Sequence, residues 1–322
     1  MTLTLDRQIF WLVEGVVAVL VAASLVGFFL SRRVRSEGGK AIVENLNARI
    51  RSWWIMIGIF ALAVLVGRAG CLLLFAFVSF LVLREYGSLI PTVPADHRTL
   101  IWSFFLFAPL HYWALYERWY LVAGIMIPVY GFLFIPLRVV LTGGAAGFLD
   151  RAARIQWGLM VSVYCLSYAA ALLTLEIPGY QRQSAKLVLF LLILVQFSDI
   201  VEYMWDKLLG KKKIAPDISP DRTWEGLVGG VASTGLLGMG LWWATPFSPL
   251  MALSMALLAA LLGFAGALVM SAIKRDRGPN DYSGSTPGPS GILDHVGSIC
   301  FSAPVFFHLA QYIYLDYIVK GP

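Results

Sequence analysis

The sequence predicts an all-α fold, a polytopic bundle of about nine or ten transmembrane helices. Hydrophobic residues make up 59% of the 322-residue chain, charged residues only 14%, and the mean hydropathy is +0.75. Soluble domains are roughly half apolar and about a quarter charged, so these values place the chain in a membrane. Its apolar runs are also long enough to cross ~30 Å of hydrocarbon at ~1.5 Å per residue.

Apolar runs that can form membrane helices recur along the whole chain. They cover residues 9–31, 53–67, 70–86, 100–116, 119–137, 155–175, 186–206, 226–244, 250–272 and 297–318. The second and third runs are short and separated at Gly67 and Arg68, which predicts either a hairpin or one bent element. The first run has no small-residue cleavage site and its basic cluster follows it, so we expect a retained anchor and not a signal peptide.

The basic residues between the runs predict how the bundle is oriented. The stretch 32–52 is read as a cytoplasmic loop, because it carries Arg32, Arg33, Arg35, Lys40, Arg49 and Arg51. Alternate crossings then put 87–99, 138–154, 207–225 and 273–296 on the same side. We expect the cell inner (cytoplasmic) membrane, with these loops facing the cytoplasm. Since Lys and Arg in such a chain report topology first, no nucleic-acid partner is expected.

Three regions divide the chain loosely. Residues 1–52 form an N-terminal anchor helix with a basic loop, 53–184 form N-terminal membrane helices, and 185–322 form the region that holds the chemistry. The three cysteines, Cys71, Cys165 and Cys300, lie far apart in apolar runs. They fit neither a disulfide framework nor metal-ligand spacing, and buried, unreactive side chains are expected.

The first concentration of polar residues is G-K-K-K-I-A-P-D-I-S-P-D-R-T-W-E-G, residues 210–226. Gly210 and the lysines suit the end of a helix, and Ser219 and Thr223 could cap the next one. So many directional donors in a proline-stiffened segment suit a polyphosphate, which Lys and Arg bind and helix N-termini attract. The alternative is a cytoplasmic loop that only ends one helix and caps another.

Two acids precede this segment inside an apolar run. Asp199 and Glu202 are three residues apart and therefore share one face of the predicted helix. An acid at membrane depth is costly and is a functional candidate by default. The alternative is a helix-end carboxylate that pairs with Lys207.

The second polar segment is S-A-I-K-R-D-R-G-P-N-D-Y-S-G-S-T-P-G-P-S-G-I-L-D-H-V-G-S, residues 271–298. Asp281 and Asp294 are hard oxygen ligands of the kind that Mg²⁺ takes beside phosphates. Glycines such as Gly291 let backbone amides approach a ligand, and His295 is expected to donate hydrogen bonds and not to bind metal. A flexible surface loop would explain the glycines equally well, but not two such loops on one side of the membrane.

These two segments resemble the phosphatidate cytidylyltransferase (CDP-diacylglycerol synthase) family. The likeness lies in the C-terminal region and is strongest over K-x-A-P, S-P-x-x-T-W-x-G-x-x-G-G, S-x-x-K-R and P-G-x-x-G-I-L-D with the following Ser. Upstream, only L-R-E-Y at 83–86 is similar to a pattern of the family. The resemblance implies transfer of a cytidylyl group from CTP to phosphatidic acid or a related anionic lipid, with Mg²⁺ as cofactor. It leaves room for a homodimer.

The resemblance also implies which residues form the site. The expected catalytic residues are Lys274, Arg275, Asp281 and Asp294. The expected substrate-binding residues are Lys207, Lys213, Ser219, Arg222, Thr223, Trp224, Gly291, His295 and Ser298. The expected metal ligands are Asp199, Glu202, Asp281 and Asp294.

The chain departs from the family pattern where acids are expected. The family's Gly-Asp is Gly266-Ala267 here, its Lys-Asp is Asn280-Asp281, its P-G-H-G-G is P-G-P-S-G, and its L-D-R-x-D is L-D-H-V-G. Glu202, where the family usually has a small residue, is expected to return one oxygen ligand. Three interpretations follow: a cytidylyltransferase, a degenerate homologue that binds nucleotide or lipid and regulates a partner, and a transporter or flippase that reuses the fold.

Overall fold

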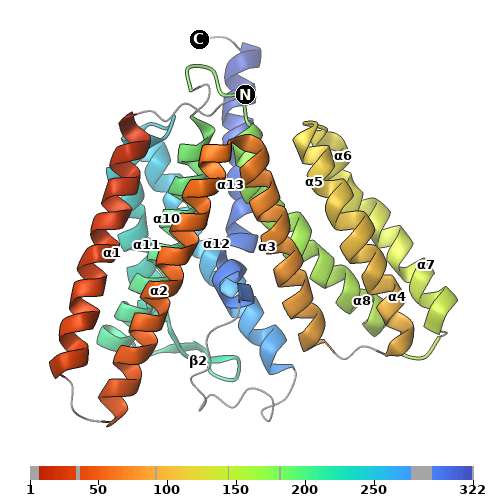
Figure 1. Ribbon diagram of the computed structural model, residues 1–322, viewed down its shortest axis with the longest axis horizontal. Helices are drawn as coiled ribbons and strands as arrows, with labels where there is room; N and C mark the ends of the chain where they lie inside the picture. The colour runs from red at the N-terminus through yellow and green to blue at the C-terminus, as the bar shows by residue number, and fades with distance from the viewer. Residues whose placement is uncertain are drawn as a thin grey trace.

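The computed structural model describes residues 7–33, 37–90, 93–143, 145–180, 183–276 and 292–320. Nearly every residue in these ranges is helical, and the helices stand side by side as a bundle (Figure 1). This confirms the predicted all-α, polytopic fold.

Single helices and composite helices make up the bundle. It begins with α1 (Arg7–Arg33), α2 (Glu37–Val66) and α3 (Arg68–Leu89). Three helices interrupted by π-helical turns follow: α4 (Pro94–Trp102), η1 (Ser103–Phe107) and α5 (Ala108–Tyr116); α6 (Tyr120–Ile125), η2 (Met126–Gly131) and α7 (Phe132–Gly143); α8 (Phe148–Leu159), η3 (Met160–Cys165) and α9 (Leu166–Ala171), with a 3-10 turn η4 (Leu172–Thr174). The C-terminal part comprises α10 (Ser184–Leu209), β1 (Lys213–Ala215), β2 (Ser219–Thr223), α11 (Trp224–Gly240), η5 (Trp242–Ala244), α12 (Pro249–Arg275) and α13 (Ile292–Lys320).

Each predicted apolar run overlaps a helical segment, but not every segment is long enough to cross a membrane on its own. Seven helices of the described chain meet the length and composition of a membrane span. The apolar part of α2, Trp53–Val66, is shorter, and α11 has only 17 residues. Several crossings are therefore established, while the count of nine or ten stays a prediction.

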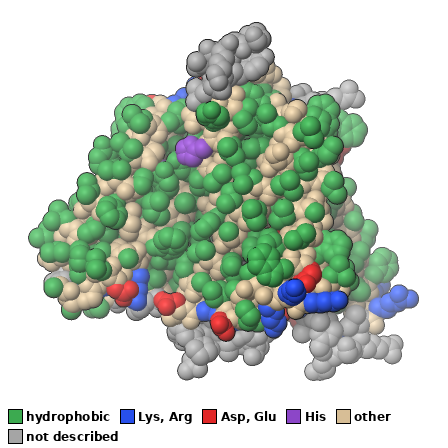
Figure 2. All heavy atoms as spheres, turned by 180° about the vertical axis from the view of Figure 1, so that it is seen from behind, with side chains coloured by type: hydrophobic (Ala, Val, Ile, Leu, Met, Phe, Trp, Pro, Cys, Tyr) green, Lys and Arg blue, Asp and Glu red, His purple; other side chains and the backbone are tan. Residues whose placement is uncertain are grey.

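The polar loops gather at one end of the bundle. Helices α1, α3, α7, α10 and α12 all end at the lower side of Figure 1. Figure 2 shows Lys, Arg, Asp and Glu side chains along that lower edge, below a surface that is mostly hydrophobic. We call this the charged end. That it faces the cytoplasm stays a prediction from the loop charges.

The expected loop over 32–52 is wrong in its conformation, because α2 is helical from Glu37 onward. Val43 and Ile50, seven residues apart, are buried, and Ile50 lies near Gly27 of α1. Lys40 and Arg51, which flank this buried stripe, are exposed. The stretch is thus amphipathic with a helical period, and packing on α1 continues the helix beyond its apolar part.

Gly67 makes the turn between the second and third helices. Its φ of 93° lies in the left-handed region that glycine adopts at no steric cost. Helix α2 ends directly before Gly67, α3 begins directly after it, and the two helices pack against one another. Of the two alternatives predicted for this stretch, the structure shows the hairpin.

Glycines bring the C-terminal helices close together. A Cβ added at Gly230 of α11 would lie 2.2 Å from Cγ of Glu202 on α10, and one at Gly226 would lie 1.9 Å from Oδ1 of Asp206. Such small residues let helix backbones approach one another within a membrane. The approach places the start of α11 directly against the acidic face of α10.

A short antiparallel hairpin departs from the all-α expectation. Strand β1 pairs with β2, with Lys213 opposite Thr223 and Ala215 opposite Ser219. The cap predicted at Thr223 is confirmed, because its Oγ1 accepts a hydrogen bond from the amide of Gly226 at 3.1 Å. The cap predicted at Ser219 is wrong, since that residue lies within β2. Gly210 follows the end of α10, as predicted.

Candidate active site

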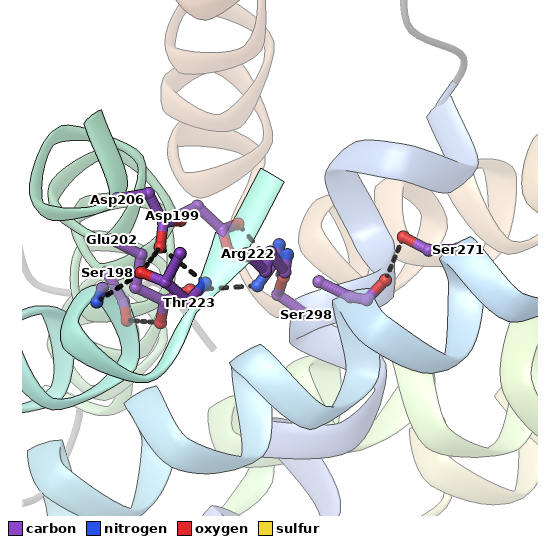
Figure 3. A network of polar contacts seen from close by, with 10 residues as sticks. Ser198, Asp199, Glu202, Asp206, Arg222, Thr223, Ser271 and Ser298 are labelled. Atoms are coloured by element: carbon purple, nitrogen blue, oxygen red, sulfur yellow. Dashed lines mark hydrogen bonds and ion pairs between the residues drawn. The ribbon is translucent and has the colours of Figure 1, made fainter. Parts of the chain in front are cut away.

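The site is built on one face of α10 near the charged end. Ser198, Asp199, Glu202 and Asp206 recur at helical spacing, so their side chains point toward the same neighbours. Figure 3 shows the three acids together with Arg222 and Thr223 of β2 and with Ser298 of α13. Residues from both polar segments of the sequence therefore meet here.

Glu202 forms an ion pair with Arg222. The Arg222 Nη1 and the Glu202 Oε2 are 3.1 Å apart, and the two side chains are 21% and 3% exposed. The other oxygen of Glu202 accepts a hydrogen bond from Ser198 Oγ at 2.8 Å. The guanidinium of Arg222 also lies 4.9 Å from the ring centre of Phe264 on α12. Arg222 is thereby fixed between α10 and α12.

Asp206 holds the start of α11. Its Oδ1 accepts hydrogen bonds from the Thr223 hydroxyl at 2.6 Å and from the Thr223 amide at 2.8 Å. Thr223 in turn caps α11. Asp206 is not among the residues predicted for the site, although its position, four residues after Glu202, puts it on the same helical face.

The basic residues of the first segment lie at the surface of the charged end. Lys207 Nζ lies 3.4 Å from Asp221 Oδ1, and both side chains are exposed. The alternative that Asp199 or Glu202 pairs with Lys207 is therefore not what the structure shows; Arg222 is the cation beside Glu202. Trp224 is 51% exposed.

Glu225 ties the lysine cluster to α11. Its Oε2 accepts hydrogen bonds from the amides of Lys211 and Lys212, each at 3.1 Å. The Lys211 amide, with its neighbours, holds the pKa of the Glu225 carboxyl below its usual range. The carboxylate of Glu225 thus joins the residues that lead into the hairpin to the start of α11.

A contact between Asp199 and Ser298 joins the two polar segments. The Ser298 hydroxyl lies 3.0 Å from Oδ1 and 3.1 Å from Oδ2 of Asp199, and Ser298 is buried. Asp199 comes from α10 and Ser298 from α13. This places Asp199, a predicted metal ligand on the helix that leads into the first segment, beside a predicted substrate residue of the second.

Other residues predicted for the second segment are only partly described. Lys274 and Arg275 form the last turn of α12 at the charged end. Asp281 and Gly291 lie outside the described residues. Asp294 and His295 belong to the first turn of α13, but their side chains are not described. Position 294 precedes Ser298 by four residues and so shares its helical face.

The positions where family acids are missing lie at a close helix crossing. A Cβ added at Gly297 of α13 would be 2.6 Å from Cγ of Met270, and one at Gly266 of α12 would be 2.5 Å from the Gly297 carbonyl oxygen. Gly263, one turn before Ala267, faces Ser298, with 3.5 Å between its added Cβ and the Ser298 Cβ. Ala267 therefore lies on the site-facing side of α12, whereas Gly297 has no room for a larger side chain.

The donor atoms fit a magnesium ion in part. No three His, Cys, Asp or Glu side chains come together for a metal ion within the ranges that the structure describes. Asp199 fits such a site, because it is a hard oxygen ligand at the face of α13 that bears Ser298 and position 294. Glu202 fits less well, since Arg222 already balances its charge.

The fold and the site define an integral membrane protein with a charged, polar site at one end of its bundle. The profile of the cytidylyltransferase family matches residues 47–313. The chain therefore belongs to the cytidylyltransferase family, which confirms the resemblance noted in the sequence.

Individual relatives agree with this assignment. The uncharacterized protein YnbB of Escherichia coli K12 is 38% identical over 296 residues, which cover 92% of this chain and 96% of YnbB. A phosphatidate cytidylyltransferase of Pseudomonas aeruginosa is 37% identical over 123 residues, and one of Staphylococcus aureus (strain COL) is 30% identical over 154 residues. These two matches cover 37% and 47% of this chain and 45% and 59% of the enzymes.

Proposed function

We propose that this protein transfers CMP from CTP to phosphatidic acid or a related anionic phospholipid. A phosphate oxygen of the lipid forms a bond to the α-phosphorus of CTP, and the bond from that phosphorus to the α,β-bridging oxygen breaks. The products are CDP-diacylglycerol and pyrophosphate. The observation that carries the proposal is the Asp199–Ser298 contact, which brings the two family motifs into one site.

The cations of the charged end support this chemistry. Phosphoryl transfer depends on positioning and on neutralising charge more than on covalent work by the protein. Arg222 is a fixed guanidinium inside the site. The other cations of the charged end are Lys207 in the last turn of α10, Lys213 in β1, and Lys274 and Arg275 in the last turn of α12. We assign the CTP phosphates to this set, with Thr223 and the start of α11 fixing the hairpin that carries Arg222.

We propose that Asp199, Asp281 and Asp294 hold Mg²⁺. The fit of the Asp199 carboxylate, and its place beside the face of α13 that bears position 294, support this assignment. When bound, the metal supplies positive charge to the triphosphate oxygens. Asp199 is itself oriented by the Ser298 hydroxyl.

Glu202 has a different role in this proposal from the one expected from the sequence. Both of its oxygens already accept, one from Ser198 and the other from Arg222, and the Arg222 guanidinium balances the charge that would attract a metal ion. We therefore assign Glu202 to holding Arg222.

A second candidate function is a homologue that binds nucleotide or lipid without transfer. The observation in its favour is the close crossing of α12 and α13, where Ala267 and Gly297 replace two acids and Gly297 leaves no space for one.

Transfer assays with purified protein distinguish the two candidates. The protein is incubated with Mg²⁺, α-labelled CTP and a panel of acceptors that includes phosphatidic acid, a lysophospholipid and a neutral diacylglycerol control. Label in a lipid product, with one pyrophosphate released per transfer, supports the enzyme. CTP binding with no transfer to any acceptor supports the second candidate.

A further inference from the structure

A glutamate of α3 reaches the start of α13, far along the chain. The Oε2 of Glu85 accepts a hydrogen bond from the backbone amide of Leu293 at 3.2 Å, across 208 residues of sequence. Leu293 is the second residue of α13 and is fully buried. Amides in the first turn of a helix have no partner within the helix, and a negative side chain beside them is favourable. Glu85 therefore fixes the first turn of α13.

That turn contains Asp294, directly after Leu293. One turn further on, Ser298 contacts Asp199 of α10. Position 294 thus lies between two anchor points on α13, one held by α3 and the other by α10. The two points are five positions apart, or about 7.5 Å at ~1.5 Å per residue.

The end of α3 that carries Glu85 is itself held in place. The Tyr86 hydroxyl donates to the Arg154 carbonyl oxygen of α8 at 3.0 Å, and Tyr86 is buried. Its ring lies so close to Gly158 that a Cβ added there would be 2.4 Å away. Glu85 therefore projects from a support that the packing of this ring on α8 makes rigid, and a phenylalanine at position 86 would keep that packing.

We infer that Glu85 is a positioning residue for the transfer reaction: it holds the first turn of α13, and with it Asp294, in register with Asp199. The inference rests on the proposed function. It assigns Glu85 no contact with substrate. A displacement of about 1 Å at a reacting group can cost about a hundredfold in rate, so loss of this anchor has a large expected effect.

Three single variants of the full chain test the contact and its consequence. Glu85→Ala removes the acceptor, Glu85→Gln keeps an acceptor oxygen, and Tyr86→Phe removes the neighbouring bond from α3 to α8 as a matched control. In hydrogen exchange, the amide of Leu293 is expected to exchange about tenfold faster or more in Glu85→Ala. It is expected to stay protected in Glu85→Gln and Tyr86→Phe. Unchanged exchange in Glu85→Ala would overturn the inference whether or not the protein transfers CMP.

Kinetics on the same folded samples separate positioning from stability. Glu85→Ala is expected to lower kcat about tenfold or more and to raise the Mg²⁺ concentration for half-maximal activity, while Glu85→Gln stays close to the parent. Parental kcat and Mg²⁺ dependence in Glu85→Ala would contradict the positioning role. An equal loss of kcat in Tyr86→Phe would also contradict it, and Glu85 would then only stabilise the start of α13. If Glu85→Ala does not fold, Glu85→Asp replaces it, and parental kinetics in that variant overturn the inference.

The role of Glu85 can also be tested if the parent shows no transfer, a result that would count against the proposed function. Equilibrium dialysis of CTP with Mg²⁺ is then compared across the series. Weaker binding in Glu85→Ala than in Glu85→Gln and Tyr86→Phe supports the positioning role. Equal binding throughout contradicts it.

Discussion

Ser298 donates its hydroxyl to the carboxylate of Asp199, 3.0 Å from one oxygen and 3.1 Å from the other. The two residues lie 99 positions apart, on α10 and α13, and the contact is partly buried. It links the two polar segments, because Asp199 precedes the hairpin of the first and Ser298 ends the second.

Ser298→Ala is expected to lower activity or Mg²⁺ affinity about ten- to hundredfold, because a residue that orients a metal-binding carboxylate has effects of this size. Ser302→Ala is the matched control. Its hydroxyl lies one turn further along α13 and bonds only the backbone oxygens of Ala259 and Ser298, at 2.8 Å each. Mg²⁺ titrations of activity for both variants make the comparison, and equal losses would remove Ser298 from the site.

The Glu202–Arg222 ion pair predicts strong coupling between these two residues. Glu202→Gln leaves the partly buried Arg222 guanidinium without its counter-charge. Arg222→Gln leaves the buried Glu202 carboxylate without its cation. Contacting residues in one network couple by about 0.5–3 kcal/mol, so the double variant is expected to be less harmed than the sum of the single ones. CTP affinities of the four proteins give the coupling energy, and additivity would contradict the pair.

Glu202→Gln in the Ala267→Asp background separates holding Arg222 from binding metal. We expect equal losses of CTP transfer in the parent and in Ala267→Asp, since Arg222 needs Glu202 in both. A clearly smaller loss in Ala267→Asp would mean that the new carboxylate replaces a metal ligand, and would return Glu202 to the metal site.

The two positions that lack acids are expected to respond in opposite ways. Ala267→Asp is expected to raise Mg²⁺ affinity, because the residue is half-buried on the side of α12 that faces Ser298. Gly297→Asp is expected to lower the free energy of unfolding by about 1–3 kcal/mol or more, because Met270 fills the space and overpacking costs this much. Mg²⁺ titration and thermal unfolding measure the two effects. Parental stability in Gly297→Asp would contradict the close crossing.

Loop orientation can be tested by cysteine labelling in a variant without the three native cysteines. Single cysteines at Ser219 and at Ser285 are expected to react only from the cytoplasmic side, because the Lys and Arg bias and the CTP supply both point there. A cysteine at the exposed Pro178, in the connection that leads into α10, is expected to react from the opposite side. Labelling of Ser219→Cys from outside would reverse the orientation.

The sequence was sufficient for the helices because membrane-spanning runs carry a strong local signal. Long apolar stretches such as those of α10 and α12 appear where they were predicted. The helical start of α2 was missed because charged residues on one face conceal the helical spacing of Val43 and Ile50. The hairpin was missed because its strands have only three and five residues and β2 contains Pro220, so that pairing depends on the neighbouring helices.

For the site, the motifs indicated residue types but not partners. Arg222, and not Lys207, meets Glu202, because the hairpin folds back over α10. Asp206 was overlooked although it shares the face of Asp199 and Glu202, since the motif does not mark it. Glu85 could not be assigned a role at all, because its contact with Leu293 depends on how α3 packs against α13.

The most direct test of the central claim is transfer of labelled CMP from CTP to phosphatidic acid by the parent protein and by Asp294→Ala. The expected result is a CDP-linked lipid and pyrophosphate from the parent. For Asp294→Ala we expect a loss of about 10²–10³ in kcat, as on removing a group that stabilises charge in the transition state. A folded parent that binds CTP but labels no lipid, or an Asp294→Ala variant with near-parental kcat, would contradict it.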